Sequence, residues 1–425
     1  MQAIGIDIGT TSICGVVIDT NTGELLKSVT KDSNAFISGV ADWEKIQSVG
    51  KIITIATEIL DSLISAQTAV IGVTGQMHGI VYVDNKGNAV SPLYTWQDGR
   101  GNQPFEDTTY AGFLGSSAGF GNVTHFYNKQ NGLVPENAVG FCTIHDYLVM
   151  RLCGLKKPQI HITDAASFGL FDLKTKRFTC ENSVDFVEDY KIAGEYKSIP
   201  VSVAIGDNQA SVLSSLSNQD ELLINVGTGS QVSVVCDDIV TAHNIETRPF
   251  FENKYIAVGA ALCGGRAYAV LKDFYKSILS TVADVDDKTV YSLMNKFLQE
   301  GEEGLPVDTR FDGTRADKTI RGSINNISTE NFTPAALTKG VLEGMIKELY
   351  DMYKSMGVNI KGIVGSGNGI RKNKALIKAA KKSFGYNLKI PYHTEEAAFG
   401  AALYGMISAG YCQNMSEAGK LIKFV

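Results

Sequence analysis

The sequence lacks any apolar run near the roughly 18–20 residues that a membrane-spanning helix needs. It also lacks a basic excess, since 39 Lys and Arg stand against 45 Asp and Glu, a net charge of −6. General binding of nucleic acid or of an anionic membrane surface requires clustered positive charge. We therefore expect neither nucleic acid nor a membrane among its partners.

No two of the seven cysteines form a CxxC pair. An odd, dispersed set argues against a disulfide framework or a zinc site, and predicts buried thiols in a reducing compartment. The strand-like run that follows Met1 already contains Asp7, and no basic segment precedes an apolar one, so a secretory signal is not expected. These features predict a cytoplasmic protein.

The composition is 44% hydrophobic and 20% charged over 425 residues, which is typical of a globular chain of two or three domains. Short Val/Ile-rich segments alternate with longer mixed ones, the pattern of an α/β fold. The expected strands are 3–8, 13–19, 69–74, 80–83, 200–205, 222–226, 232–236, 255–259 and 361–365. The expected helices are 42–65, 141–152, 208–216, 267–280, 288–299, 334–356, 372–384 and 395–409.

An internal repeat stands out. Residues 4–19 align without a gap on residues 222–237, and each copy predicts a strand, a tight Gly-Thr turn and a second strand. Two similar hairpins could align by chance, but the match includes the turn residues and therefore favours two duplicated domains. With a boundary at the polar connection that ends at Pro200, we expect domains 1–200 and 201–425. The aligned pairs include Asp7 with Asn225, Gly9 with Gly227, and Thr10 with Thr228.

The tip of the first hairpin, residues 7–12, reads DIGTTS. Successive turn amides and hydroxyls can bind anionic oxygens, and Asp7 could hold a cation against the same phosphate. The second tip, 227–230, keeps the donors without the carboxylate. Two such tips and one acid suggest a polyphosphate with Mg²⁺, although a capped turn with a solvated aspartate remains the alternative. A GxxxxGK[ST] motif is absent, which excludes a P-loop nucleotide site.

A second glycine-rich segment, 365–369, lies between an expected strand and an expected helix. Its spacing is not that of a dinucleotide fingerprint. It could be a flexible loop or the turn on which a nucleoside rests.

Two blocks could line a polyol pocket. The segment 74–79 offers the amide of Gln76 and the imidazole of His78 at a strand end, and the segment 96–100 sets an aromatic face beside an amide, a carboxylate and a guanidinium. His78 could instead be structural, and Asp98 with Arg100 could be a surface ion pair. Asp207 follows another strand, where it could cap a helix or accept a proton from a substrate hydroxyl.

Taken in order, DIGTTS, TGQMHG, WQDGR, GDNQAS, NVGTGS, GSGNGIRKN and EEAAFGAA resemble the FGGY family of carbohydrate kinases. The segments 119–127, 143–155 and 164–172 are more similar to its sedoheptulokinases than to its xylulokinases or glycerol kinases. The resemblance implies two ribonuclease H-like domains of the sugar kinase, heat-shock ATPase and actin superfamily, with ATP and sugar meeting in an interdomain cleft.

The resemblance also implies the reaction, ATP-dependent phosphorylation of the terminal hydroxyl of a ketose, with sedoheptulose the first candidate. A different ketose or polyol, or an ATP-dependent binding protein without sugar turnover, are the alternatives. The oligomeric state is open, with a homodimer among the alternatives. In the implied site, Asp207 is the catalytic base and contacts the sugar; Asp7 organises Mg²⁺; Thr10, Thr11, Gly227 and Thr228 contact phosphates; Gly264 and Gly265 form a nucleotide-facing turn; Gly365, Gly367, Asn368 and Asn373 hold adenosine; Gln76, Met77, His78 and Asp98 line the sugar site.

Overall fold

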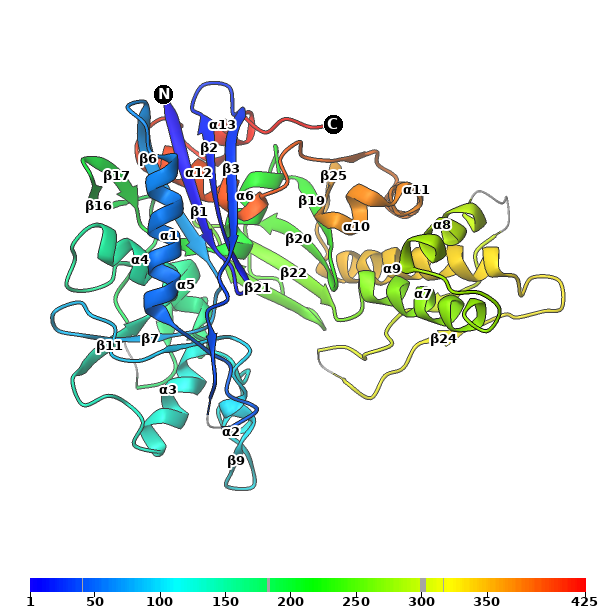
Figure 1. Ribbon diagram of the computed structural model, residues 1–425, viewed down its shortest axis with the longest axis horizontal. Coiled ribbons are helices and arrows are strands. Elements are labelled where there is room, and N and C mark those ends of the chain that lie inside the picture. The colour runs from blue at the N-terminus through cyan, green and yellow to red at the C-terminus, as the bar shows by residue number, and fades with distance from the viewer. Residues whose placement is uncertain (40, 182–183, 299–302, 316) are drawn as a thin grey trace. The chain divides into compact units, whose positions relative to one another are not determined.

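The computed structural model describes residues 1–39, 41–181, 184–298, 303–315 and 317–425, and its contacts divide the chain into two compact units (Figure 1). Unit 1 comprises 1–217, 248–254 and 395–423, and unit 2 comprises 218–247, 255–394 and 424–425. Each unit has its own sheet and its own hydrophobic core.

The sheet of unit 1 has the strand order β16-β17-β6-β1-β2-β3, with β18 also pairing with β6. Strands β1, β2 and β3 form an antiparallel meander, whereas β6 runs parallel to β1 and to β17. The strands are β1 (Gln2–Ile8), β2 (Ser12–Asp19), β3 (Leu25–Asp32), β6 (Thr68–Gly75), β16 (Ile192–Tyr196), β17 (Ile199–Ser202) and β18 (Ile205–Gly206).

The sheet of unit 2 repeats this arrangement, in the order β21-β22-β20-β19-β25-β26. Its antiparallel strands β19, β20 and β22 correspond to the meander of unit 1, and β25 and β26 run parallel to β19 as β6 and β17 run parallel to β1. The internal repeat predicted from the sequence is therefore confirmed as a repeated sheet. The strands are β19 (Glu221–Val226), β20 (Ser230–Cys236), β21 (Ile245–Pro249), β22 (Tyr255–Ala261), β25 (Gly362–Ser366) and β26 (Leu388–Lys389).

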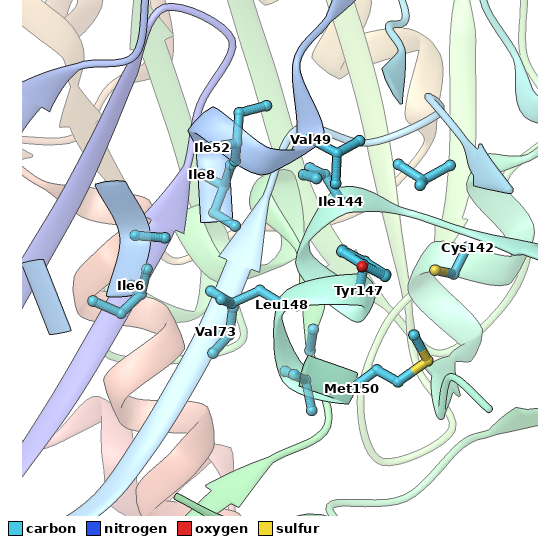
Figure 2. Close-up of a cluster of buried hydrophobic side chains, with 14 of the residues drawn as sticks. Ile6, Ile8, Val49, Ile52, Val73, Cys142, Ile144, Tyr147, Leu148 and Met150 are labelled. Atoms are coloured by element: carbon cyan, nitrogen blue, oxygen red, sulfur yellow. The ribbon is translucent and has the colours of Figure 1, made fainter. Parts of the chain in front are cut away.

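Helices pack against the sheet of unit 1 through apolar side chains of both the strands and the helices. Figure 2 shows Ile6 and Ile8 of β1 and Val73 of β6 in one buried cluster with side chains of α1 and α4. Another helix, α12, packs unusually close to the strands: a Cβ on Gly5 or on Gly72 would lie 1.8 Å from a carbonyl oxygen of α12. Glycine is required at both positions because any side chain would displace the helix.

The remaining elements complete the two units. The helices of unit 1 are α1 (Val49–Leu63), η1 (Gly99–Asn102), α2 (Tyr110–Leu114), α3 (Gly121–Gln130), α4 (Ile144–Leu152), α5 (Ile162–Ser167), α6 (Asp207–Ser215), α12 (Glu396–Ser408) and α13 (Met415–Gly419). Those of unit 2 are α7 (Gly265–Leu279), α8 (Asp287–Phe297), α9 (Pro334–Met356), α10 (Gly367–Lys372) and α11 (Lys374–Phe384). The short strands are β4 (Phe36–Ile37), β5 (Ile46–Gln47), β7 (Val81–Asp84), β8 (Leu93–Tyr94), β9 (Pro104–Phe105), β10 (Thr108–Thr109), β11 (Ala138–Cys142), β12 (Ile160–His161), β13 (Phe171–Asp172), β14 (Arg177–Phe178), β15 (Phe186–Val187), β23 (Val307–Asp308) and β24 (Ser323–Ile324).

Most expected strands and helices are present, and the differences have local causes. The helix expected from residue 42 begins only at Val49, after the short strand β5, because Ser48 caps it by accepting from an amide of its first turn. The helix expected over 372–384 is divided at Asn373, whose side chain accepts from the amides of Ala375 and Leu376. The end of the helix expected over 288–299 lies outside the described residues.

The division between the units falls after Ser217, later in the chain than the boundary expected at residue 200. The segment expected to be one strand over 200–205 consists of β17 and β18, and both pair with β6 of unit 1. Helix α6, which follows β18, packs against α12, and the late segment 395–423 returns to unit 1. Asp207 therefore belongs to unit 1.

No helix of the described chain combines the length and the apolar character needed to cross a bilayer. All seven cysteines are free thiols, as their dispersed spacing predicted.

Candidate active site

In unit 1, three parallel strands bring candidate residues to one edge of the sheet. Asp7 is the penultimate residue of β1, Gln76 directly follows β6, and Asp207 directly follows β18. The register pairs Asp7 with Thr74 on β6, and Gly206 with Gly75. Because the carboxyl ends of neighbouring parallel strands meet at the same edge, these side chains converge although they are about 200 residues apart in sequence.

The carboxyl group of Asp7 is short of hydrogen-bond partners. Its Oδ1 is buried and receives no hydrogen bond from any described group. Burial, and after it the negative charges of Asp207 and Glu395, together raise the pKa of Asp7 from 3.8 to about 7. A buried oxygen without a donor, among like charges, is the environment in which a cation would be stabilised. The residues present therefore fit Mg²⁺, which prefers carboxylate and phosphate oxygens.

Asp207 stands at the first position of α6. Burial raises the pKa of its carboxyl group, while His145 and Arg248 lower it in part. A raised pKa strengthens an aspartate as a proton acceptor near neutral pH, because proton transfer is best when the pKa of the base approaches the working pH. The alternative in which Asp207 caps the helix is wrong, because the N-cap of α6 is Gly206 and no side chain caps this helix.

The first hairpin tip is tied to the polyol motifs by a chain of hydrogen bonds. Oγ1 of Thr10 accepts from Nε1 of Trp96 at 3.0 Å and donates to Oε1 of Gln76 at 3.3 Å. Gln76 in turn donates to Gln47 at 2.9 Å, and Gln47 donates to the carbonyl of Thr10 at 2.7 Å. Trp96 is 47% exposed, so part of this residue is accessible to a ligand while its ring nitrogen is held. Thr11, the other predicted phosphate contact on this tip, is exposed.

His78 has a constrained position. Its backbone φ is 72°, and its ring stacks on Phe120 with centroids 4.2 Å apart. Nδ1 lies 2.7 Å from the carbonyl oxygen of Ser167; since a carbonyl only accepts, Nδ1 carries the proton in the neutral ring. The neighbouring Met77 is buried, and its thioether would clash with a Cβ on Gly206. Gln76, Met77 and His78 thus lie around the strand end that carries Asp207.

The carboxylate of Asp98, unlike the side chains of the 76–78 segment, is bound by an ion pair and several hydrogen bonds within the protein. The side chain is 1% exposed, accepts from Nε of Arg100 at 2.6 Å and from NH2 at 3.2 Å, and also accepts from the amide of Lys45 at 3.0 Å. Arg100 is equally buried, donates to Asn128, and lies over the ring of Tyr94 at 4.1 Å. These contacts give Asp98 a structural role, and direct binding of a sugar stays a prediction.

Unit 2 holds a cavity of about 830 Å³ at the carboxyl ends of β19 and β25. Asn225 near the end of β19 donates to Ser366 at the end of β25 at 2.7 Å, which joins the ends of the two strands. The backbone of the first turn is closed by Gly265, whose amide donates to the carbonyl of Gly227 at 3.0 Å. Six predicted nucleotide contacts line this cavity: Gly227, Thr228, Gly265, Gly367, Asn368 and Asn373.

Two predicted contacts do not line the cavity. A Cβ on Gly264 would lie 2.3 Å from the backbone of Gly229, and one on Gly365 would meet Leu388 at 2.5 Å, so both glycines serve close packing behind the turns. Tyr268 and Tyr291, which were not predicted from the sequence, also line the cavity, with ring centroids 5.9 Å apart. Aromatic residues on helices are typical of cores, so no sequence signal distinguished them.

Comparison with known proteins then gives the family. Residues 2–112 match the N-terminal domain model, and residues 222–409 the C-terminal domain model, of the FGGY family of carbohydrate kinases. The chain belongs to this family. It is accordingly an ATP-dependent carbohydrate kinase, as the ordered motifs predicted.

Individual relatives match over nearly their whole length. A sedoheptulokinase from Mus musculus is 28% identical, covering 94% of this chain and 96% of the relative, and a xylulose kinase from Staphylococcus xylosus is 25% identical, covering 97% and 92%. Among solved structures, a xylulose kinase from Rhodospirillum rubrum superposes with a TM-score of 0.85 at 16% identity, over 100% of this chain and 93% of that one. A xylulose kinase from Lactobacillus acidophilus superposes with a TM-score of 0.83 at 20% identity, over 100% of this chain and 92% of that one. These similarities confirm the two-domain actin-like ATPase fold.

Proposed function

We propose that this kinase transfers the terminal phosphate of ATP to the terminal hydroxyl of a ketose, with sedoheptulose as its first substrate. The observation that carries the proposal is the convergence of Asp7, Asp207 and the 76–78 segment at one edge of the unit 1 sheet. The full-length similarity to a sedoheptulokinase supports the choice of sugar.

Asp207 acts as the general base in this proposal. Its carboxylate accepts the proton of the attacking hydroxyl, while Gln76 and His78 orient the sugar chain by hydrogen bonds. Phosphoryl transfer has a loose transition state in which the proton moves late, so a carboxylate is a sufficient base. Burial, which raises the pKa of Asp207, improves the match to neutral pH.

Asp7 holds Mg²⁺, directly or through a water, by the carboxylate whose Oδ1 has no described donor. When bound, Mg²⁺ supplies neutralisation of the phosphate charge. The amides and hydroxyls of Thr10 and Thr11 then face phosphate oxygens. The hydrogen bonds from Trp96 and to Gln76 fix Thr10, so occupation of the sugar site and of the phosphate loop are mechanically linked.

The nucleotide occupies the cavity of unit 2. A volume of about 830 Å³ lies within the usual range for small-molecule sites. The polyphosphate lies along the Gly227-Thr228 turn, where the amide and hydroxyl of Thr228 supply donors, and Arg266 and Lys372 of the cavity lining supply positive charge. Adenosine lies against the start of α10 and Asn373. Tyr268 lines the same cavity and offers an apolar surface for the adenine ring.

The decisive experiment is ADP release from ATP and Mg²⁺ with sedoheptulose, xylulose, ribulose and glycerol, each compared with the rate without sugar. We expect the largest kcat/KM with sedoheptulose, and a product phosphorylated at the terminal carbon by NMR. A preference for xylulose would transfer the proposal to that ketose. An ADP release rate that no sugar increases would contradict the proposal.

The role of Asp207 has its own test. Asp207→Asn keeps the shape of the side chain and removes its basicity, so kcat should fall about 10²–10⁴-fold, with ATP binding by calorimetry unchanged. The matched control is Glu58→Gln, an exposed carboxylate of the same unit that pairs with Lys31, and it should leave kcat unchanged. An Asp207→Asn variant with the wild-type kcat would remove Asp207 from this role.

A further inference from the structure

Beneath the base, unit 1 contains a buried cluster that the proposed reaction does not use. His145 and Asp146 open α4, and Asp164 lies in the first turn of α5. The three side chains are 0%, 1% and 0% exposed. One ligand atom from each lies within 4.8 Å of the others.

The cluster is short of hydrogen bonds to a degree that is unusual for a protein interior. By hydrogen-bond geometry, both ring nitrogens of His145, both carboxyl oxygens of Asp164 and Oδ1 of Asp146 have no partner among the described residues, although the carboxyl groups of Asp164 and Asp146 lie close enough to act on each other. Only Oδ2 of Asp146 is satisfied, by the hydroxyl of Thr143 at 2.7 Å and its amide at 3.3 Å. Buried polar atoms are normally paired, and each unpaired one is costly.

The charge balance points in the same direction. Asp146 and Asp164 are two acidic side chains without access to solvent, and Asp207 is a third acidic group close enough to act on Asp164. His145 is the nearest basic side chain, with its Nε2 3.0 Å from Oδ1 of Asp164. A divalent cation would bind oxygens of both acidic groups and the imidazole nitrogen together.

From this arrangement we propose that His145, Asp146 and Asp164 form a structural site for one divalent transition-metal ion. Zinc binds histidine nitrogen and aspartate oxygen at about 2.0–2.2 Å, so two neighbouring ligand atoms on one ion lie roughly 3.0–3.4 Å apart. Nε2 of His145 lies 3.0 Å from Oδ1 of Asp164, without hydrogen-bond geometry. With Asp164 bidentate and Asp146 supplying Oδ1, the set offers four donor atoms, one imidazole and three oxygens, which suits Zn²⁺ or Mn²⁺.

The scaffold holds these ligands from several sides. Figure 2 shows Ile144, Tyr147 and Leu148 of α4 within the hydrophobic cluster of unit 1, and they fix the start of the helix that carries His145. The ring is confined on its other edge, since a Cβ on Gly75 would lie 3.0 Å from Nδ1. The ion would therefore join α4 and α5 directly behind the strand ends that carry the catalytic residues. It is distinct from the Mg²⁺ at Asp7.

Metal analysis of the purified full-length chain tests the proposal. After gel filtration in buffer with a brief EDTA wash, we expect about one equivalent of zinc or manganese per chain by mass spectrometry of the elements. After prolonged chelation, addition of Zn²⁺ or Mn²⁺ alone should raise the unfolding midpoint. A wild-type chain with less than about a tenth of an equivalent, and with a midpoint that neither ion shifts, would overturn the proposal and assign the cluster to shared protons.

Variants locate the ion. Asp164→Asn and His145→Gln should lose the bound metal and the midpoint shift on adding it. Asp7→Asn should keep both, which separates this site from the catalytic Mg²⁺, and so should Asp351→Asn, an exposed carboxylate of unit 2. Retention of a full equivalent by folded Asp164→Asn would also overturn the proposal. Because metal content is measured without sugar or ATP, failure here leaves the proposed kinase reaction untouched.

Discussion

The buried pair of Asp98 and Arg100 gives a prediction that separates a structural role from a sugar-binding one. The two perturbations are Asp98→Asn, which keeps the shape and an acceptor oxygen, and Arg100→Met, which keeps the length and apolar stem. Each leaves the other charge buried at 1% exposure without its partner. The double variant removes both charges.

The magnitude follows from the contacts. Asp98 accepts two side-chain hydrogen bonds from Arg100, and the guanidinium lies 4.1 Å from the centre of the Tyr94 ring. Removing one partner of a buried ion pair costs about 3–5 kcal/mol, whereas replacing both is often nearly neutral. Glu44, 3.8 Å from Arg100, offsets part of the loss in Asp98→Asn, so Arg100→Met should cost more. For a unit of this size, about 3–5 kcal/mol corresponds to a fall of roughly 6–20 °C in Tm.

The assay is thermal unfolding at pH 7 of wild type, both single variants and the double variant, together with KM for the sugar at a temperature where all are folded. We expect a large fall in Tm in each single variant, and a fall in the double variant that is well below the sum of the two single falls. KM for the sugar should change less than about threefold. An Asp98→Asn variant with unchanged Tm and a KM raised by an order of magnitude would refute this reasoning and make Asp98 a direct sugar ligand.

Three further predictions concern other parts of the chain. Asp7→Asn should raise the Mg²⁺ concentration needed for half-maximal turnover at least tenfold, and an unchanged Mg²⁺ titration would count against Asp7 as the Mg²⁺ residue. Burial raises the pKa of Glu348 from 4.5 to about 7. A raised pKa in the folded state favours folding at low pH, and this contribution is lost as the pH rises from about 4.5 through 7. The free energy of unfolding of Glu348→Gln should therefore rise by about 1–3 kcal/mol relative to that of wild type between pH 5 and pH 8. Urea unfolding at the two values measures this gain, and equal differences at both would contradict it. Gly72→Ala places a Cβ 1.8 Å from the carbonyl oxygen of Ala401, so it should destabilise unit 1 by about 1–3 kcal/mol or more; a Tm within 1 °C of wild type would show that α12 shifts freely.

Short motifs predicted the structure well where the local conformation depends on residues that are adjacent in sequence. The two Gly-Thr hairpin tips and the strand that ends before Gln76 lie where the sequence predicted them, because turn residues and apolar strands encode their own geometry. The segment 365–369 is not a flexible loop, since it consists of the end of β25 and the start of α10. Capping residues were the weak point. Ser48 and Asn373 begin helices inside segments that apolar spacing alone assigned to longer ones.

What the sequence determined by itself was the family, the duplicated sheet and the residues available for the chemistry, since these are carried by short motifs and by their order. Tertiary structure alone decided that Asp207 belongs to the first unit, because β18 finds its partner in β6, more than a hundred residues earlier. It also decided that Asp98 forms a buried ion pair with Arg100, and that His145 lies beside Asp164 in a site without access to solvent. Such outcomes depend on burial and on contacts between distant segments, and the residue types alone do not specify either.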